Sequence, residues 1–112
     1  MMPDSERFRS ALTLCEFVTG MAYVMETAGG LDEAMSDRLD ECVQPVRTAR
    51  DWLWSAGGSM MRNESLPGDF DYGLEVAQSR ALLALPEIKA LLEETCDAFR
   101  RAKCGNALRT GL

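Results

Sequence analysis

The chain contains no histidine among its 112 residues. This absence excludes Ser-His-Asp and Cys-His triads, zinc sites with a His ligand and the carboxylate-His di-iron motif, since each needs an imidazole. Paired cysteines are missing as well, because the four thiols lie far apart with no C-x-x-C spacing. They are Cys15, Cys42, Cys96 and Cys104. We therefore expect reduced cysteines serving as small core residues, with no metal and no cofactor.

Export and membrane signals are also missing. The acidic residues Asp4 and Glu6 stand where a secretory signal needs a basic region followed by an apolar run. The longest uncharged stretch near the start, residues 17–25, is well short of the about 18 apolar residues that a membrane span requires. These features predict a cytoplasmic protein without membrane contact.

The charge balance is acidic, with 18 Asp and Glu residues against 12 Lys and Arg residues and a net charge of -6. The excess lies between Asp32 and Glu75, whereas the C-terminal part is basic. Its basic residues include Arg100, Arg101, Lys103 and Arg109. Cations near the end of a helix complement its dipole, and an acidic chain is poorly suited to neutralising phosphates. We expect no direct contact with nucleic acid.

Glycine pairs at 29–30 and 57–58, together with the turn sequence at 66–68, divide the chain into helical segments. Apolar residues recur within them at spacings of three and four. The pattern predicts helices over 4–28, 31–56 with a kink near Pro45, 71–85 and 86–104, a loop over 57–70 and a frayed tail over 106–112. Pro86 either kinks one long helix or stands at the first position of a fourth. The expected fold is all-α, a single-domain antiparallel three- or four-helix bundle with no sheet.

Two apolar lines run along the first predicted helix, so it needs two neighbours. One line comprises Phe8, Ala11, Cys15, Val18, Ala22 and Met25, and the other Leu14, Phe17, Met21, Val24 and Ala28. Gly20 inside this helix costs about 1 kcal/mol relative to alanine unless another backbone lies close to it. We therefore expect close packing at Gly20.

Single heptad lines mark the later segments. The line of 31–56 comprises Met35, Leu39, Cys42, Val46, Ala49, Leu53 and Ala56, and the later line comprises Phe70, Leu74, Ala77, Ala81, Ala84, Ile88, Leu91, Thr95, Ala98 and Ala102. A second apolar line accompanies the latter and comprises Leu82, Leu85, Leu92, Cys96 and Phe99. These residues form the predicted core.

A candidate binding surface lies at the end of the second predicted helix and in the long loop behind it. Trp54 sits about 100° away from the heptad line of its helix, and tryptophan, arginine and methionine are favoured at interfaces. The predicted interface residues are Trp54, Met60, Met61, Arg62, Phe70 and Tyr72. The alternative for Trp54 is packing on the third segment or under the following loop, and for the two methionines it is capping the open end of the bundle.

An acidic patch is predicted at the start of the second helix, formed by Asp32, Glu33, Asp37, Asp40 and Glu41. One interpretation is a solvated helix face whose carboxylates favour the positive end of the helix dipole. The other is a negative surface that steers the protein onto the basic groove of a nucleic-acid-handling partner, because complementary potentials raise the association rate.

Catalysis has a weaker basis. Two carboxylate sets with helical spacing, Asp37, Asp40 and Glu41 and then Glu93, Glu94 and Asp97, could hold magnesium if they faced each other, as in helical nucleotide pyrophosphohydrolases. A homodimeric assembly or chaperone subunit is a further alternative, which the two-sided first helix permits. We keep both as alternatives.

The leading hypothesis is a non-enzymatic acidic helical protein, with no catalytic residue, that binds and blocks or regulates another protein. Small phage-encoded inhibitors of host defence complexes, such as anti-CRISPR proteins, are of this class, which makes a phage or bacterial source the expected one. The comparison rests on size, charge and missing catalytic machinery, and no residue motif carries it.

Overall fold

The computed structural model describes residues 4–66 and 68–109, with side chains as far as Arg101. The chain forms three helices, α1 (Asp4–Ala28), α2 (Glu33–Met61) and α3 (Phe70–Arg109), and no strand occurs within these ranges. The all-α bundle predicted from the apolar spacing is confirmed. The bounds of α1 coincide with those predicted.

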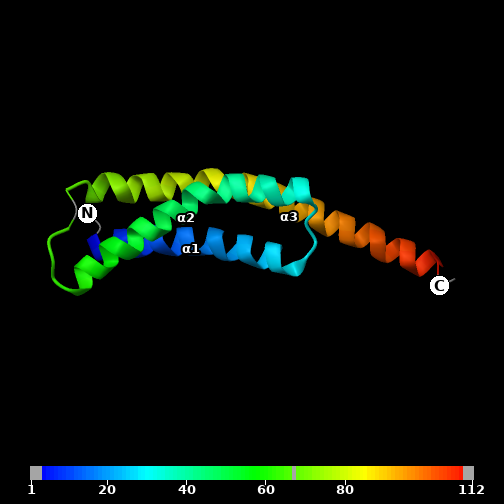
Figure 1. The fold of residues 1–112 in the computed structure, drawn as a ribbon, viewed down its shortest axis with the longest axis horizontal. Coiled ribbons are helices and arrows are strands. Elements are labelled where there is room, and N and C mark those ends of the chain that lie inside the picture. Colours follow the sequence, from blue (N-terminus) through cyan, green and yellow to red (C-terminus); the bar gives the residue numbers. More distant parts are fainter. Residues whose placement is uncertain (1–3, 67, 110–112) are drawn as a thin grey trace.

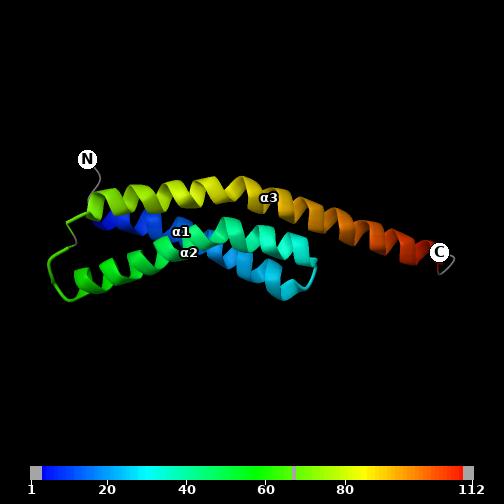
Figure 2. The same cartoon turned by 45° about the horizontal axis from the view of Figure 1, so that its top comes forward.

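The helices run up, down and up, so that α2 is antiparallel to α1 and α3 (Figure 1). The molecule is elongated, with extents of 67 × 24 × 23 Å. Its length comes from α3, which has 40 residues against 25 in α1 and continues well past the turn between α1 and α2 (Figure 2). Each helix contacts both others along the shared part of the bundle.

The core is formed by most of the predicted heptad-line residues. Ala98 is exposed, against its predicted core position, and four others are only partly buried, namely Phe8, Met35, Cys42 and Thr95. Its buried apolar residues are Ala11, Cys15, Val18, Ala22 and Met25 from α1, Leu39, Val43, Val46, Ala49, Leu53 and Ala56 from α2, and Phe70, Leu74, Ala77, Ala81, Ala84, Ile88 and Leu91 from α3. Alanine dominates the contribution of α3, so this helix packs closely against its neighbours. Val43 is a core residue that the narrow heptad line did not include.

The observed α2 differs at both ends from the predicted range 31–56. It begins two residues later because Asp32 is its N-cap, accepting a hydrogen bond of 2.8 Å from the Met35 amide. It continues through the glycine pair to Met61, since Gly57 serves packing: a Cβ atom there would lie 2.8 Å from the Phe8 ring. The helix ends before Asn63, whose φ of 57° is left-handed.

Neither proline inside the later helices ends its helix. Pro45 lies within a continuous α2, whose axis changes direction near its middle (Figure 1). Pro86 lies within a continuous α3, so of the two alternatives for residues 71–104 the structure has the single long helix. Pro86 and Leu82, whose carbonyl loses its helical donor, are both exposed, so water can replace the missing bond. The predicted tail 106–112 belongs to α3 as far as Arg109, and the rest lies outside the described residues.

The second apolar lines of α1 and α3 are largely exposed. No atom lies within 4 Å of a Cβ atom built at Gly20, so the expected close packing there is wrong. Phe17, Val24, Leu82 and Phe99 are all more than half exposed. Cys96 is exposed too, against its predicted core position, because α3 outruns the other helices at this point. Cys104 and Ala102 lie outside the described side chains.

None of the helices in the described ranges combines the length and apolar character that crossing a membrane requires.

Candidate functional site

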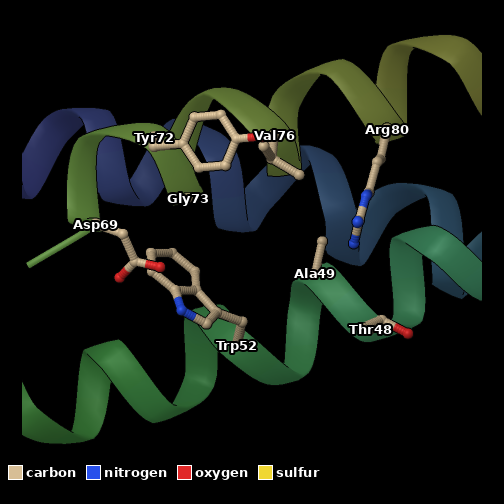
Figure 3. A pocket seen from close by; sticks show the side chains of 8 residues that line it. All are labelled: Thr48, Ala49, Trp52, Asp69, Tyr72, Gly73, Val76 and Arg80. Carbon is tan, nitrogen blue, oxygen red and sulfur yellow. The ribbon is translucent and has the colours of Figure 1, made fainter. Parts of the chain in front are cut away.

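A mostly apolar groove lies between α2 and α3, beside the predicted interface residue Tyr72 (Figure 3). We call it the α2/α3 groove. Its volume is about 200 Å³. It is lined by Thr48, Ala49, Trp52, Asp69, Tyr72, Gly73, Val76 and Arg80. A cavity of this size accepts one large apolar side chain, and a mostly apolar lining with polar ends is typical of binding pockets.

Helical spacing brings the groove residues together. Thr48 and Trp52 are four residues apart on α2, and Tyr72, Val76 and Arg80 follow the same spacing on α3. The Trp52 ring is held against the core by Phe70, with centroids 6.2 Å apart and planes inclined by 35°. Tyr72 lies across the groove from Trp52 (Figure 3) and is 69% exposed. The aromatic walls are therefore fixed on one side and accessible on the other.

Opposite charges mark the two ends of the groove. Arg80 reaches across from α3 and donates a hydrogen bond of 3.4 Å to the Pro45 carbonyl, and Asp69 lies beside Trp52 at the other end (Figure 3). Neither Arg80 nor Asp69 forms an ion pair with a residue in the described part of the chain. Both charges are consequently free to meet groups of a bound molecule.

Trp54 lies on a different edge, where α2 meets α1. Its indole Nε1 donates a hydrogen bond of 3.1 Å to Glu16, and the Arg50 guanidinium stands 4.5 Å from the ring centre. The ring is 52% exposed. The structure thus separates Trp54 from Tyr72, because residues 52 and 54 point to opposite sides of α2.

The other predicted interface residues fall into three environments. Met61 is 86% exposed at the last turn of α2, whereas Met60 is partly buried against the core. Arg62 binds Glu64 with an Nε–Oε1 distance of 2.6 Å. Phe70 is a core residue and is not on the surface. Of the six predicted residues, Tyr72 lines the α2/α3 groove.

The acidic patch is exposed, but its members differ. Asp32 is engaged in capping α2, and Asp40 lies 3.5 Å from the Arg47 guanidinium. Glu33, Asp37 and Glu41 form no ion pair with residues that the structure describes. Glu41 precedes Thr48 by seven residues, two helical turns, so the patch and the groove share one side of α2.

The two carboxylate sets considered for magnesium are not joined. Arg38 lies between the helices and binds Glu87 at 2.7 Å and Glu94 at 3.0 Å, and these hydrogen bonds raise the pKa of Arg38 above its ordinary value. Among the described residues, no three Cys, Asp or Glu side chains cluster so that they could hold a metal ion.

Trp52, Val76 and Arg80 were not among the predicted site residues. The signal that could have found them is the four-residue spacing of Tyr72, Val76 and Arg80, which marks one face of α3 beside its heptad line. Their convergence with Trp52 depends on the register between α2 and α3, which the periodicity of each helix alone does not give.

Comparison with known proteins found no matching family model, no similar curated protein and no similar solved structure.

Proposed function

We propose that the protein is a non-enzymatic binding module that blocks or regulates another protein. A protruding apolar side chain of that partner enters the α2/α3 groove, and a basic surface beside it meets Asp37 and Glu41. The observation that carries the proposal is the groove itself, which has aromatic walls, unpaired charges at both ends and room for one side chain.

The electrostatic part of the proposal concerns the partner's identity. Exposed carboxylates two turns from the groove favour a partner whose binding surface is positive, as the nucleic-acid-binding groove of a host defence complex is. An inhibitor or adaptor of phage or bacterial origin, acting in the cytoplasm, fits this arrangement. Mutating the exposed carboxylates then slows association more than it speeds dissociation.

The test is affinity capture from cells of the source organism, with the bound protein identified by mass spectrometry and its affinity then measured with purified components. We expect Tyr72→Ala to weaken binding at least about tenfold, the usual loss at a central aromatic contact. Tyr23→Ala is the matched control, because Tyr23 is 66% exposed but lies on α1. If the Tyr72→Ala and Tyr23→Ala variants bind the partner with equal affinity, the partner does not bind in the α2/α3 groove.

The non-enzymatic part is tested separately. Purified protein with magnesium and a panel of nucleoside triphosphates is expected to release no pyrophosphate. Steady release that disappears on replacing Asp37 and Asp97 with alanine would contradict the proposal and favour the pyrophosphohydrolase alternative.

A further inference from the structure

The solvent side of α1 carries a heptad line of its own. Thr13, Phe17, Gly20, Val24 and Thr27 are separated by four, three, four and three residues, and all five are exposed. Phe17 is 56% and Val24 60% exposed. We call these five residues the outer face of α1. Heptad spacing of this kind is what a helix presents to another helix, and no helix of the described chain occupies it.

This face is uncharged in a strongly acidic protein. Between Ser10 and Met25 the single charged residue is Glu16, which is turned toward α2 and accepts the Trp54 hydrogen bond. Leu82 of α3, 57% exposed, lines an open groove with Phe17 and extends the apolar surface sideways. Two copies of a chain with a charge of -6 repel each other, so a neutral face is where they can approach.

Gly20 lies at the centre of the outer face and has no packing role within the chain. Glycine in a helix interior lowers stability, and the usual compensation is the close approach of another backbone. We propose that a second copy of this chain supplies that backbone, crossing antiparallel to α1 with the two-fold axis beside Gly20. Phe17 of each copy then packs against Val24 of the other, and Thr13 lies opposite Thr27.

The register between α1 and α3 supports this arrangement at the ends. Arg7 binds Asp71 at 2.7 Å, and a Cβ atom at Gly30 would touch Thr95, so the parallel helices are offset by 64 to 65 residues. Along the bundle axis, residue 84 of α3 therefore lies at the same height as Gly20. Arg100 lies 16 residues beyond this height on α3, and Asp4 lies 16 residues before it on α1.

In the antiparallel dimer, the first turn of α1 from one copy consequently lies beside the projecting part of α3 from the other. Glu6 stands on that first turn and forms no ion pair with a residue in the described part of the chain, whereas Asp4 pairs with Arg7 of its own copy at 3.3 Å. The exposed Arg100 and Arg101 stand on that part of α3. Glu6 of one copy therefore lies beside Arg100 of the other, twice by symmetry. This complementarity selects a second copy over an unrelated apolar partner.

The contact is smaller than a standard interface. Along the about 35 Å of α1, a strip one helix diameter wide, about 10–12 Å, covers roughly 400 Å² on each copy, and Leu82 of α3 adds to it, against roughly 800 Å² per partner in standard interfaces. No residue of α1 lines the α2/α3 groove, so the groove of each copy stays free in the dimer. Dimerisation and the proposed partner binding can therefore fail independently.

The experiment is sedimentation equilibrium of the full chain over a wide concentration range. The wild type is expected to be dimeric, and Phe17→Glu to raise the dissociation constant at least about tenfold. Gly20→Leu does the same by placing a side chain where the second backbone approaches, and its Cβ atom meets no neighbouring element of its own chain. Leu83→Glu, at a site 79% exposed on α3, is the control and leaves the constant unchanged. A wild type that is monomeric at every concentration would overturn the proposal, as would a dimer weakened by Leu83→Glu and not by Phe17→Glu.

Charge exchange tests the antiparallel orientation. Arg100→Glu is expected to weaken the dimer, and combining it with Glu6→Arg to restore most of the affinity, because the two sites face each other across the interface. Circular dichroism and the melting temperature of each variant at low concentration show whether it is folded. If the double variant is folded but dimerises even more weakly than Arg100→Glu alone, the antiparallel orientation is contradicted.

Discussion

The indole ring of Trp52 occupies the space that a Cβ atom would take at Gly73. The ring comes from α2 and lies so close to α3 that only a residue without a side chain leaves room for it. Gly73 also donates its amide to the Asp69 carbonyl at 2.8 Å, in the first turn of α3. The base of the α2/α3 groove therefore depends on a glycine inside a helix.

Replacing Gly73 with alanine overpacks the contact with Trp52, which usually costs about 1–3 kcal/mol. Alanine brings a gain of about 1 kcal/mol to a helix interior, so a net destabilisation of up to about 2 kcal/mol is expected. Urea unfolding followed by circular dichroism measures the difference. The same variant should also narrow the groove and weaken partner binding, because Trp52 has to move.

Gly20→Ala is the matched control, since Gly20 is also inside a helix but meets no atom of its own chain. Below the concentration at which the chain associates, this change is expected to raise the free energy of unfolding by about 0.5–1 kcal/mol. Changes of the same sign in both variants would show that Trp52 does not restrict position 73.

The N-cap of α2 provides a second prediction. Asp32→Ala removes the acceptor of the Met35 amide and is expected to lower the free energy of unfolding by about 1 kcal/mol. Asp37→Ala removes the same charge from the same exposed helix but no capping bond, so a change below about 0.5 kcal/mol is expected. If both variants lose equal stability, charge and not capping is responsible.

The three helices were predictable because each carries an apolar line with regular spacing. The errors arose where one residue type has two uses. Glycine pairs ended the first helix as predicted, but at Gly57 the missing side chain makes room for Phe8 within a continuing helix. At Pro86 the sequence left a kinked helix and a new helix open, and α3 continues there with Ala84 and Ile88 buried on either side of the proline. Such choices are decided by neighbours distant in sequence.

The candidate site was predictable in part for the same reason. Tyr72 could be identified as a surface group from its place beside the long loop, and the acidic residues of α2 from their charge and their place at the start of the helix. Whether Trp52 or Trp54 would face α3 was not apparent, since each is one position off the heptad line and on a different side of it. The register between helices determines this, and periodicity within one helix contains no information about it.

The two tryptophans are expected to contribute very differently to stability. Trp52 is partly buried between Phe70 and Gly73, so Trp52→Ala is expected to cost about 2–4 kcal/mol. Trp54→Ala gives up an exposed hydrogen bond to Glu16 and the contact with Arg50, for which about 1 kcal/mol is expected. Guanidinium unfolding of the two single variants compares them directly. If Trp54→Ala lowers the free energy of unfolding more than Trp52→Ala does, the contact between α2 and α1 contributes more to stability than the groove does.

The cysteines offer a prediction about reactivity and pH. Cys15 is fully buried, its thiol donates to the Ala77 carbonyl at 3.6 Å, and burial raises its pKa above the ordinary value. The folded state therefore holds the proton more tightly than the unfolded state does. The stabilisation that this gives is complete below the unfolded pKa and is lost as the pH rises through the folded one.

In a Cys104→Ser variant at neutral pH, alkylation followed by mass spectrometry should label the exposed Cys96 quickly, the half-buried Cys42 more slowly and Cys15 only through unfolding. The labelling rate of Cys15 should then fall with every substitution that stabilises the fold, Gly20→Ala included, and rise with Gly73→Ala. The labelling rate of Cys96 should change with neither kind of substitution, because this thiol is exposed on α3 without any opening of the bundle. Labelling of Cys15 as fast as that of Cys96 would mean that α1 and α3 separate around it in the native state.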